Sequence, residues 1–263
     1  MSRLSADDLD TLLRYADSLR ESRRHGEAID AYRRAIDFGA ARAPVEFALA
    51  ALGAGQEPPL APPQYVREHF DAFANGFDRH LTVSLRYRVP ELLCAVLFAE
   101  LPEHDLDVLD LGCGTGLCAP MLQPYARRLV GIDLSECMLE RARERGGYDE
   151  LRCDDIVSGL TDPPASFDLI LAADVFVYVG DLAPLFAVVQ SVLRSGGRFA
   201  FSIETNEDAD FALASTMRYT HSRNYLERLT AGFGLRLEAI ERHAIRQEDR
   251  IDVPGDIVVL RRV

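Results

Sequence analysis

Three glycines at alternate positions and two aspartates have the types and spacing to bind a nucleoside. Gly112, Gly114 and Gly116 follow a short apolar run that contains Asp110, and a second apolar run ends on Asp133 about 20 residues after the turn. Glycine lets a ligand lie against the main chain. An acid at the tip of a second strand can accept hydrogen bonds from both ribose hydroxyls. The pattern therefore predicts a nucleoside-containing ligand on a strand–turn–helix–strand unit.

The spacing of the glycines distinguishes between nucleosides. A dinucleotide-binding turn has its last glycine three positions after the second, where this chain has Leu117; its third glycine, Gly116, comes one residue early. Asp110 would repel a pyrophosphate but could pair with an ammonium group. These features favour S-adenosylmethionine (SAM), which has an amino-acid tail and no phosphate. An NAD-dependent oxidoreductase stays as a less favoured alternative.

The segment resembles motif I of the class I SAM-dependent methyltransferases, which has the form D-x-G-x-G-x-G. Asp110, Gly112, Gly114 and Gly116 match it position for position. The resemblance covers roughly residues 64–263. It implies an α/β fold: a Rossmann-like, doubly wound, mostly parallel sheet of seven strands with helices on both faces and an antiparallel final strand. It also implies SAM as cofactor and S-adenosylhomocysteine as product.

Residues beyond Asp133 are expected to hold the adenine. Leu134 and Met138 come directly after the ribose acid and could form a floor under the ring. Asp154 and Asp155 precede the apolar Ile156, and the family places an acid followed by an apolar residue here. Because two acids are adjacent, either one fits as the partner of the adenine amino group.

The fourth expected strand, residues 167–174, ends where the family holds the methyl group. Ala173 and Asp174 are therefore expected beside the cofactor, and Asp174 and Tyr178 are candidates for substrate contact. The D/N-P-P-F/Y tetrapeptide of many amino-group methylators of DNA and protein is missing here, which lowers the expectation for those substrates.

The sulfonium of SAM already activates its methyl group, so catalysis needs mainly alignment and exclusion of water. A base is needed only when the nucleophile must lose a proton. His221 and Tyr178 are the candidate catalytic residues, and His80 is a third acid–base group. His221, between the fifth strand and a helix, is the first to test, although a lone histidine is more often structural.

An aromatic stretch before the first strand, within residues 64–100, is similar to a lid that many family members carry, FDxxAxxFDxHL. The matching positions are Phe70, Asp71, Ala74, Phe77, Asp78, His80 and Leu81. The resemblance implies helices that fold over SAM and exclude water, with Phe77 and His80 against the cofactor. Taken singly, each aromatic residue is equally consistent with an ordinary helix core.

A separate N-terminal region, residues 1–55, precedes a proline- and glycine-rich connector at 53–63. Residues 5–24 and 27–38 have the apolar spacing of amphipathic helices, and a third helix is expected at 45–52. The pair resembles a single tetratricopeptide repeat. One repeat cannot bury its own apolar face, so the hairpin must pack on the main domain, on a second copy or on a protein partner. Packing on the main domain is the leading expectation.

The composition excludes several classes of function. The 263 residues carry a net charge of −13 and include no lysine, which argues against a nucleic-acid partner and excludes Schiff-base chemistry. The sequence shows neither a membrane-spanning apolar run nor a signal core, so a cytoplasmic protein without membrane contact is expected. Five cysteines without a CxxC pair indicate reduced thiols and no metal site.

Together these patterns favour a SAM-dependent methyltransferase that acts on an oxygen, nitrogen or carbon atom of a small molecule. Two alternatives remain open. The hairpin could recruit a protein substrate, or the chain could be a SAM-binding interaction protein without catalytic activity.

Overall fold

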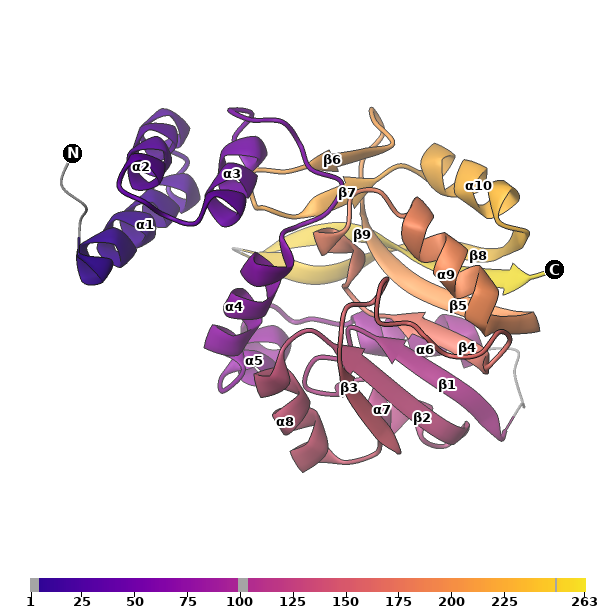
Figure 1. Cartoon of the computed structure of the whole chain (residues 1–263). Helices are drawn as coiled ribbons and strands as arrows, with labels where there is room; N and C mark the ends of the chain where they lie inside the picture. The colour runs from indigo at the N-terminus through magenta and orange to yellow at the C-terminus, as the bar shows by residue number, and fades with distance from the viewer. Residues whose placement is uncertain (1–4, 99–103, 249) are drawn as a thin grey trace.

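The computed structural model describes residues 5–98, 104–248 and 250–263 (Figure 1). A single sheet forms the centre of the molecule, and helices cover both of its faces. On β1, Leu109 and Leu111 belong to the apolar core that α9 and α10 cover, whereas Leu106 and Val108 belong to the core that α6 and α7 cover. Side chains alternate between the faces of a strand, so this fully buried strand has apolar residues for both faces and is interrupted only by Asp107 and Asp110.

Among the residues that the structure describes, the sheet contains nine strands. They are β1 (Leu106–Leu111), β2 (Ala126–Asp133), β3 (Glu150–Cys153), β4 (Phe167–Ala172), β5 (Leu193–Thr205), β6 (Phe211–Leu213), β7 (Tyr219–His221), β8 (Leu235–Glu248) and β9 (Ile251–Arg262). Seven of them run in the order β3-β2-β1-β4-β5-β9-β8. Only β9 is antiparallel to the others in this set. The expected fold class and the antiparallel final strand are confirmed.

Two short strands were not expected. β6 and β7 form an antiparallel hairpin, and β7 pairs in parallel with the last two residues of β5. Because Glu204 of β5 pairs with β9 on one side and β7 on the other, the hairpin extends the sheet just beyond the end of β4. It therefore lies next to the strand tips where ligands bind in such sheets.

The helices are α1 (Ala6–Glu21), α2 (His25–Asp37), α3 (Arg42–Ala51), α4 (Pro63–Phe73), α5 (Phe77–Arg79), η1 (His80–Ser84), α6 (Val89–Phe98), α7 (Ala119–Leu122), α8 (Glu136–Arg145), η2 (Phe176–Tyr178), α9 (Ala183–Val192) and α10 (Arg223–Gly232). The Ser135 hydroxyl caps α8 by accepting the Met138 N–H at 3.1 Å. α7 has only four residues, because the glycine turn continues to Cys118.

The N-terminal helices pack on the β6–β7 hairpin of the same chain. Figure 1 shows α1 and α2 extending away from the sheet, with α3 nearest to β6. Phe47 of α3 lies 5.2 Å from Tyr65 and 6.1 Å from Tyr219 between ring centroids, and Met217 joins the same buried core. Arg20 of α1 donates to the Ser215 carbonyl at 3.2 Å. This packing on the main domain is the first of the three arrangements that the sequence left open. In the described part of the chain, no helix is both long and apolar enough to cross a bilayer.

Candidate functional site

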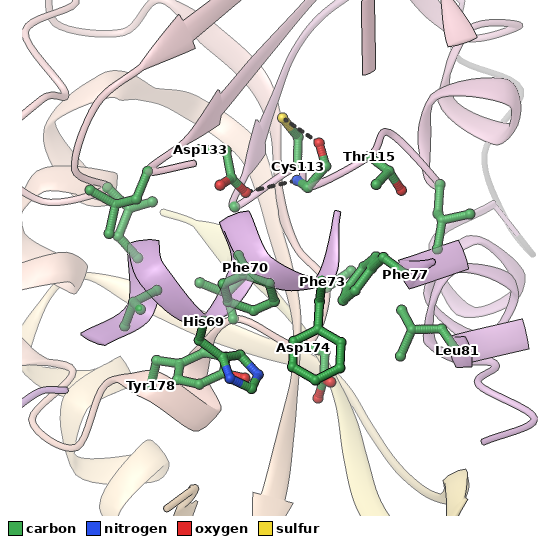
Figure 2. A pocket seen from close by; sticks show the side chains of 18 of the residues that line it. His69, Phe70, Phe73, Phe77, Leu81, Cys113, Thr115, Asp133, Asp174 and Tyr178 are labelled. Carbon is green, nitrogen blue, oxygen red and sulfur yellow. Dashed lines mark hydrogen bonds between the residues drawn. The ribbon is translucent and has the colours of Figure 1, made fainter. Parts of the chain in front are cut away.

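A cavity of about 320 Å³ lies at the carboxyl ends of β1, β2 and β4, beneath the segment α4–η1 (Figure 2). The carboxyl ends of parallel strands meet at one edge of a sheet, which is where ligands bind in doubly wound folds. Each strand contributes one acid to the lining: Asp110 from β1, Asp133 from β2 and Asp174 after β4. Asp155, which follows β3, is a fourth.

The glycine turn after β1 needs glycine for two different reasons. Gly112, Gly114 and Gly116 all have positive φ, at 63°, 54° and 82°. A Cβ on Gly112 would lie 2.6 Å from Val175 Cγ2, whereas one on Gly114 would meet nothing within 4 Å. Both of these glycines line the cavity. Gly116, which we expected to contact the cofactor, does not line the cavity: a Cβ built on it would lie 3.0 Å from the Tyr148 ring.

Two buried aspartates define one end of the cavity. Asp110 accepts a hydrogen bond from the Tyr148 hydroxyl at 2.7 Å, and burial raises its pKa to about 7. Asp133 accepts the backbone N–H groups of Gly114 at 2.8 Å and Ser135 at 2.9 Å, and burial raises its pKa to about 6. Neither carboxylate forms an ion pair with any residue that the structure describes. This end of the cavity therefore favours a cationic or hydroxyl-rich ligand.

The residues expected around adenine divide into two groups. Leu134, Asp155 and Ile156 line the cavity. Asp154 is exposed and lies outside it, so of the two adjacent acids only Asp155 faces this space. Met138, on the buried face of α8, is fully buried and also lies outside the lining, which corrects the expectation that it floors the ring.

Ala173, Asp174 and Tyr178 line the cavity where β4 ends. Asp174 has a φ of 59°, and its N–H donates to the Ser202 hydroxyl at 2.9 Å. Its two carboxylate oxygens accept from Arg218 Nη2 at 2.9 and 2.8 Å. A non-glycine residue in this conformation is strained and persists only where its surroundings hold it. The hydroxyl and the guanidinium do so here.

The lid of α4, α5 and η1 closes the other side of the cavity, as expected. Phe70 lies edge-on to both Tyr178 and Phe77, with ring centroids 5.4 and 5.7 Å apart. Phe77 and the exposed His80 belong to the lining. Figure 2 shows Phe70, Phe73 and Phe77 gathered between Asp133 and Asp174.

Polar contacts hold the lid on the glycine turn and on α8. Asp78 accepts from the Thr115 hydroxyl at 2.5 Å and pairs with Arg145. Asp71 accepts from the Ser135 hydroxyl at 2.5 Å. Ser135 and Thr115 each lie beside a residue of the nucleoside-binding pattern, so the lid's position is coupled to the shape of the ligand-binding turn.

His221 requires a correction. Its side chain is fully buried and lies outside the cavity. Nε2 lies 2.9 Å from the Val179 carbonyl and 3.1 Å from the Gly180 carbonyl, and burial lowers its pKa to about 4. The ring is therefore neutral near pH 7 and donates to these carbonyls. Its role is to fasten β7 to the segment after η2, and acid–base work in the cavity is not supported.

Among the cavity residues that were not anticipated from the sequence are four that can form hydrogen bonds in the cavity: His69, Tyr87, Thr115 and Arg218. His69 lies in the lid and Thr115 in the glycine turn. Both segments were recognised from the sequence, so these two residues could have been predicted from their neighbours. Tyr87 stands in a linker, and Arg218 precedes the unexpected strand β7. No motif covers either of these two.

Comparison with known proteins agrees with this geometry. A family profile described as a methyltransferase domain matches residues 109–201. The probable S-adenosylmethionine-dependent methyltransferase CRG1 of Saccharomyces cerevisiae is 33% identical over 130 residues, which are 45% of this chain and 44% of the relative. The ubiquinone biosynthesis O-methyltransferase of Idiomarina loihiensis is 31% identical over 99 residues, 36% of this chain and 41% of the relative.

A solved structure also matches. The S-adenosylmethionine-dependent methyltransferase from Mesorhizobium loti is 27% identical, with a TM-score of 0.53, and the match covers 66% of this chain and all of that one. The chain spans less than half the length of the two curated relatives above. Fold, motif and matches place it in one class, the nucleoside-binding α/β transferases of one-carbon groups. Residues 109–201 match the methyltransferase domain, and in fold and motif the chain is similar to the class I SAM-dependent methyltransferases, whose cofactor is SAM.

Proposed function

We propose that the chain transfers the methyl group of SAM to an oxygen, nitrogen or carbon atom of a small molecule held under the lid. One observation carries the proposal: a single cavity joins the unpaired acids Asp110 and Asp133 to the strand tip that holds Asp174 and Tyr178. Such a cavity can hold a cofactor and an acceptor together, which makes the transfer effectively unimolecular.

The residues present fit SAM. Asp133 would accept the ribose hydroxyls, and Asp155, Ile156 and Leu134 would surround the adenine. Asp110, buried without a cation, would pair with the ammonium of the methionine tail, while Gly114, with nothing near its Cβ position, leaves room along the main chain. When bound, SAM supplies an already activated methyl group.

The chain's own contribution is then to position the cofactor and the methyl acceptor and to exclude water from the cavity. The lid aromatics cover the cavity and keep out water, which strengthens the polar interactions inside it. Tyr178 and His80 remain the acid–base candidates that line the cavity. Because burial raises the pKa of Tyr178, its hydroxyl stays protonated at neutral pH and orients an acceptor by donating a hydrogen bond.

Two measurements test the proposal. Calorimetry with SAM and NAD side by side should show binding of SAM only. Release of S-adenosylhomocysteine should then appear with a pool of small metabolites and remain at background with a peptide pool. Turnover restricted to peptides would favour a protein substrate recruited by α1–α3. SAM binding without turnover on either pool would favour a non-catalytic interaction protein, and binding of NAD alone would overturn the assignment of the site.

SAM binding is expected to weaken about tenfold between about pH 7.0 and about pH 5.5. The carboxyl of Asp110 has a raised pKa of about 7 in the cofactor-free chain, so below that pH it is protonated and cannot pair with an ammonium. Binding must then release a proton, and affinity falls as the pH falls. Asp110→Asn should bind SAM more weakly at about pH 7.0 and lose most of this dependence. Calorimetry at both pH values measures it, and an unchanged slope in the variant would assign the effect elsewhere.

Asp78→Ala is expected to speed SAM dissociation several-fold, because it removes the lid's contacts with Thr115 and Arg145. Both side chains of the ion pair are partly exposed, so the free energy of unfolding should change by less than about 1 kcal/mol. Stopped-flow release of SAM and denaturant unfolding measure the two quantities. The matched control is Glu136→Ala. It removes an exposed ion pair with Arg143 on α8, the helix that also carries Arg145, and should change neither the release rate nor the free energy of unfolding. Equal release rates for the two variants would show that Asp78 does not hold the lid.

A further inference from the structure

The end of the cavity opposite Asp133 is lined by aromatic side chains and by groups that donate hydrogen bonds. Figure 2 shows His69, Tyr178 and Asp174 at this end. The lid contributes Phe70 and Phe73, and the segment after η1 contributes Tyr87. The flat apolar walls suit a ring or another planar group.

Arg218 is the single arginine that lines the cavity within the described residues, in a chain that has no lysine. It precedes β7, in the hairpin that the seven-stranded core lacks. Its guanidinium carbon lies 5.8 Å from the centre of the Tyr178 ring, and its side chain is 17% exposed. Within the described residues, one arginine therefore lines the end of the cavity opposite Asp133, and it comes from the β6–β7 hairpin.

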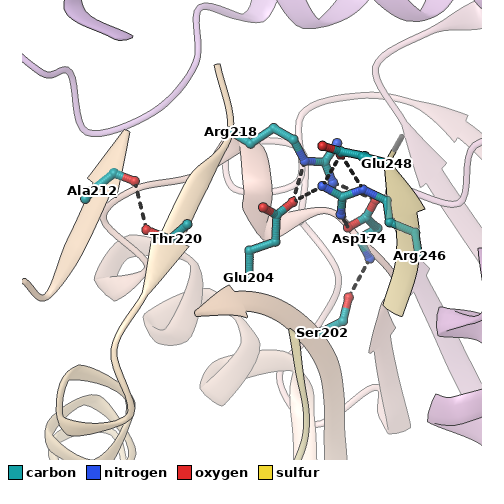
Figure 3. Close-up of polar contacts among 8 residues, drawn as sticks. All are labelled: Asp174, Ser202, Glu204, Ala212, Arg218, Thr220, Arg246 and Glu248. Carbon is teal, nitrogen blue, oxygen red and sulfur yellow. Dashed lines mark hydrogen bonds and ion pairs between the residues drawn. The ribbon is translucent and has the colours of Figure 1, made fainter. Parts of the chain in front are cut away.

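Two acids hold this guanidinium in place (Figure 3). Arg218 Nη2 donates to both oxygens of Asp174, and Nε donates to Glu204 Oε1 at 2.5 Å. For Nη1, no acceptor is found among residues 5–98, 104–248 and 250–263. An arginine has five N–H donors in a rigid fork, so two of them remain for a ligand.

The surrounding cluster also leaves an excess of unpaired N–H donors, although its three carboxylates outnumber its two arginines. Arg246, 3% exposed, shares Glu204 Oε1 at 2.6 Å and pairs with Glu248 at 2.7 Å. Its Nη1 lies 3.9 Å from Asp174 Oδ1 and is buried without a hydrogen-bond partner in the described chain. Because Asp174 and Glu204 are divided between two arginines, they leave N–H groups of both arginines without an acceptor, and a ligand that accepts hydrogen bonds would satisfy those of Arg218.

Two hydroxyls add to this excess. Tyr87 and Tyr178 both line the cavity, and neither hydroxyl has a hydrogen-bond partner within the part of the chain that is described. Tyr87 lies between the two ends of the cavity, because Asp174, Arg218 and Asp110 are all among the charges that act on its hydroxyl. Burial raises the pKa of both phenols, so they donate. A ligand group that accepts several hydrogen bonds fits this end best.

We propose that the methyl acceptor is a planar, mainly apolar molecule bearing a carboxylate, and that Arg218 Nη1 binds this carboxylate with help from the Tyr87 and Tyr178 hydroxyls. The inference rests on the proposed methyl transfer and specifies its acceptor. Asp174 and Glu204 already accept hydrogen bonds from Nη2 and Nε of the guanidinium. Its remaining edge, at Nη1, has room for one carboxylate. Arg218 is thereby a specificity-determining residue.

Three probes that share a 4-hydroxyphenyl ring test the proposal on the full chain loaded with S-adenosylhomocysteine: 4-hydroxybenzoate, 4-hydroxybenzamide and 4-hydroxybenzylamine. The benzoate should bind about tenfold or more tighter than the amide, and the amine more weakly still. Arg218→Gln should reduce benzoate binding to the level of the amide and leave SAM affinity within about twofold. The matched control, Arg198→Gln, removes an arginine that also pairs with a glutamate (Glu238, 2.7 Å) but lies outside this cavity, and it should preserve the preference.

Two further variants guard against loss of folding in Arg218→Gln. Arg218→Lys keeps the charge without the fork, and Tyr87→Phe removes one hydroxyl without changing charge; each should reduce benzoate binding selectively. Equal binding of amide and benzoate, a preference that survives in the Arg218 variants, or no binding of any probe at millimolar concentration would overturn the proposed acceptor class. SAM binding measured in parallel separates this outcome from failure of the proposed function, because only the latter predicts that SAM also fails to bind.

Discussion

Asp133→Ala is expected to weaken SAM binding by about 5- to 150-fold, corresponding to ~1–3 kcal/mol. The carboxylate has two roles in the structure. It holds the backbone N–H of Gly114, at 2.8 Å, and that of Ser135, at 2.9 Å, and it faces the cavity where the ribose is proposed to bind. Alanine removes both the ribose acceptor and the clamp on the glycine turn. Calorimetric titration with SAM measures the loss.

Two variants separate the roles. Asp133→Asn keeps one acceptor for the Gly114 N–H, so it should lose less affinity than alanine if the clamp matters. Asp149→Asn is the matched control, because its carboxylate also accepts a backbone N–H of β2, that of Leu129 at 2.7 Å, but in the middle of the strand and away from the cavity. It should bind SAM as the unmodified chain does. Unchanged affinity in Asp133→Ala would show that this strand tip does not hold the cofactor.

The cofactor half of the site was largely predictable because its signals are local. Asp110, the glycine turn and Asp133 lie within one strand–turn–strand unit, and the apolar runs on either side predict two adjacent buried strands. Once those strands pair in parallel, their tips must meet. The choice between Asp154 and Asp155 was not predictable in this way, because it depends on how the turn after β3 directs each side chain.

The acceptor half could not be predicted because its residues are distant in sequence. Arg218 reaches Asp174 across 44 positions, and it does so only because β6 and β7 extend the sheet beyond β4. The three residues of β7 are too few for a periodic signal. For His221, too, the sequence near the residue did not show which distant segments surround it. It follows a strand and precedes a helix, which suggested an accessible loop, yet the pairing of β7 with β5 buries it completely.

Gly112→Ala is expected to lower the free energy of unfolding of the cofactor-free chain by about 2–5 kcal/mol. Two costs combine. Alanine at a φ of 63° adopts a left-handed conformation, and its Cβ would lie 2.6 Å from Val175 Cγ2. Val175 is β-branched and stiff at χ1, so the contact is relieved only by moving backbone. Denaturant unfolding measures the loss.

Gly114→Ala is the matched comparison, because Gly114 has a similar φ of 54° but open space around the Cβ position. It should lose only about 1–2 kcal/mol, the conformational cost alone. Val175→Ala made in the Gly112→Ala background should recover stability, giving a coupling energy of about 1 kcal/mol or more in the double-mutant cycle. Equal losses of unfolding free energy at the two glycines, with no coupling to Val175, would mean that the Val175 side chain moves aside. Both positions would then need glycine only for their positive φ. The expected inequality assigns Gly112 to packing of the turn against the segment after β4, and leaves Gly114 as the glycine whose open side faces the cofactor.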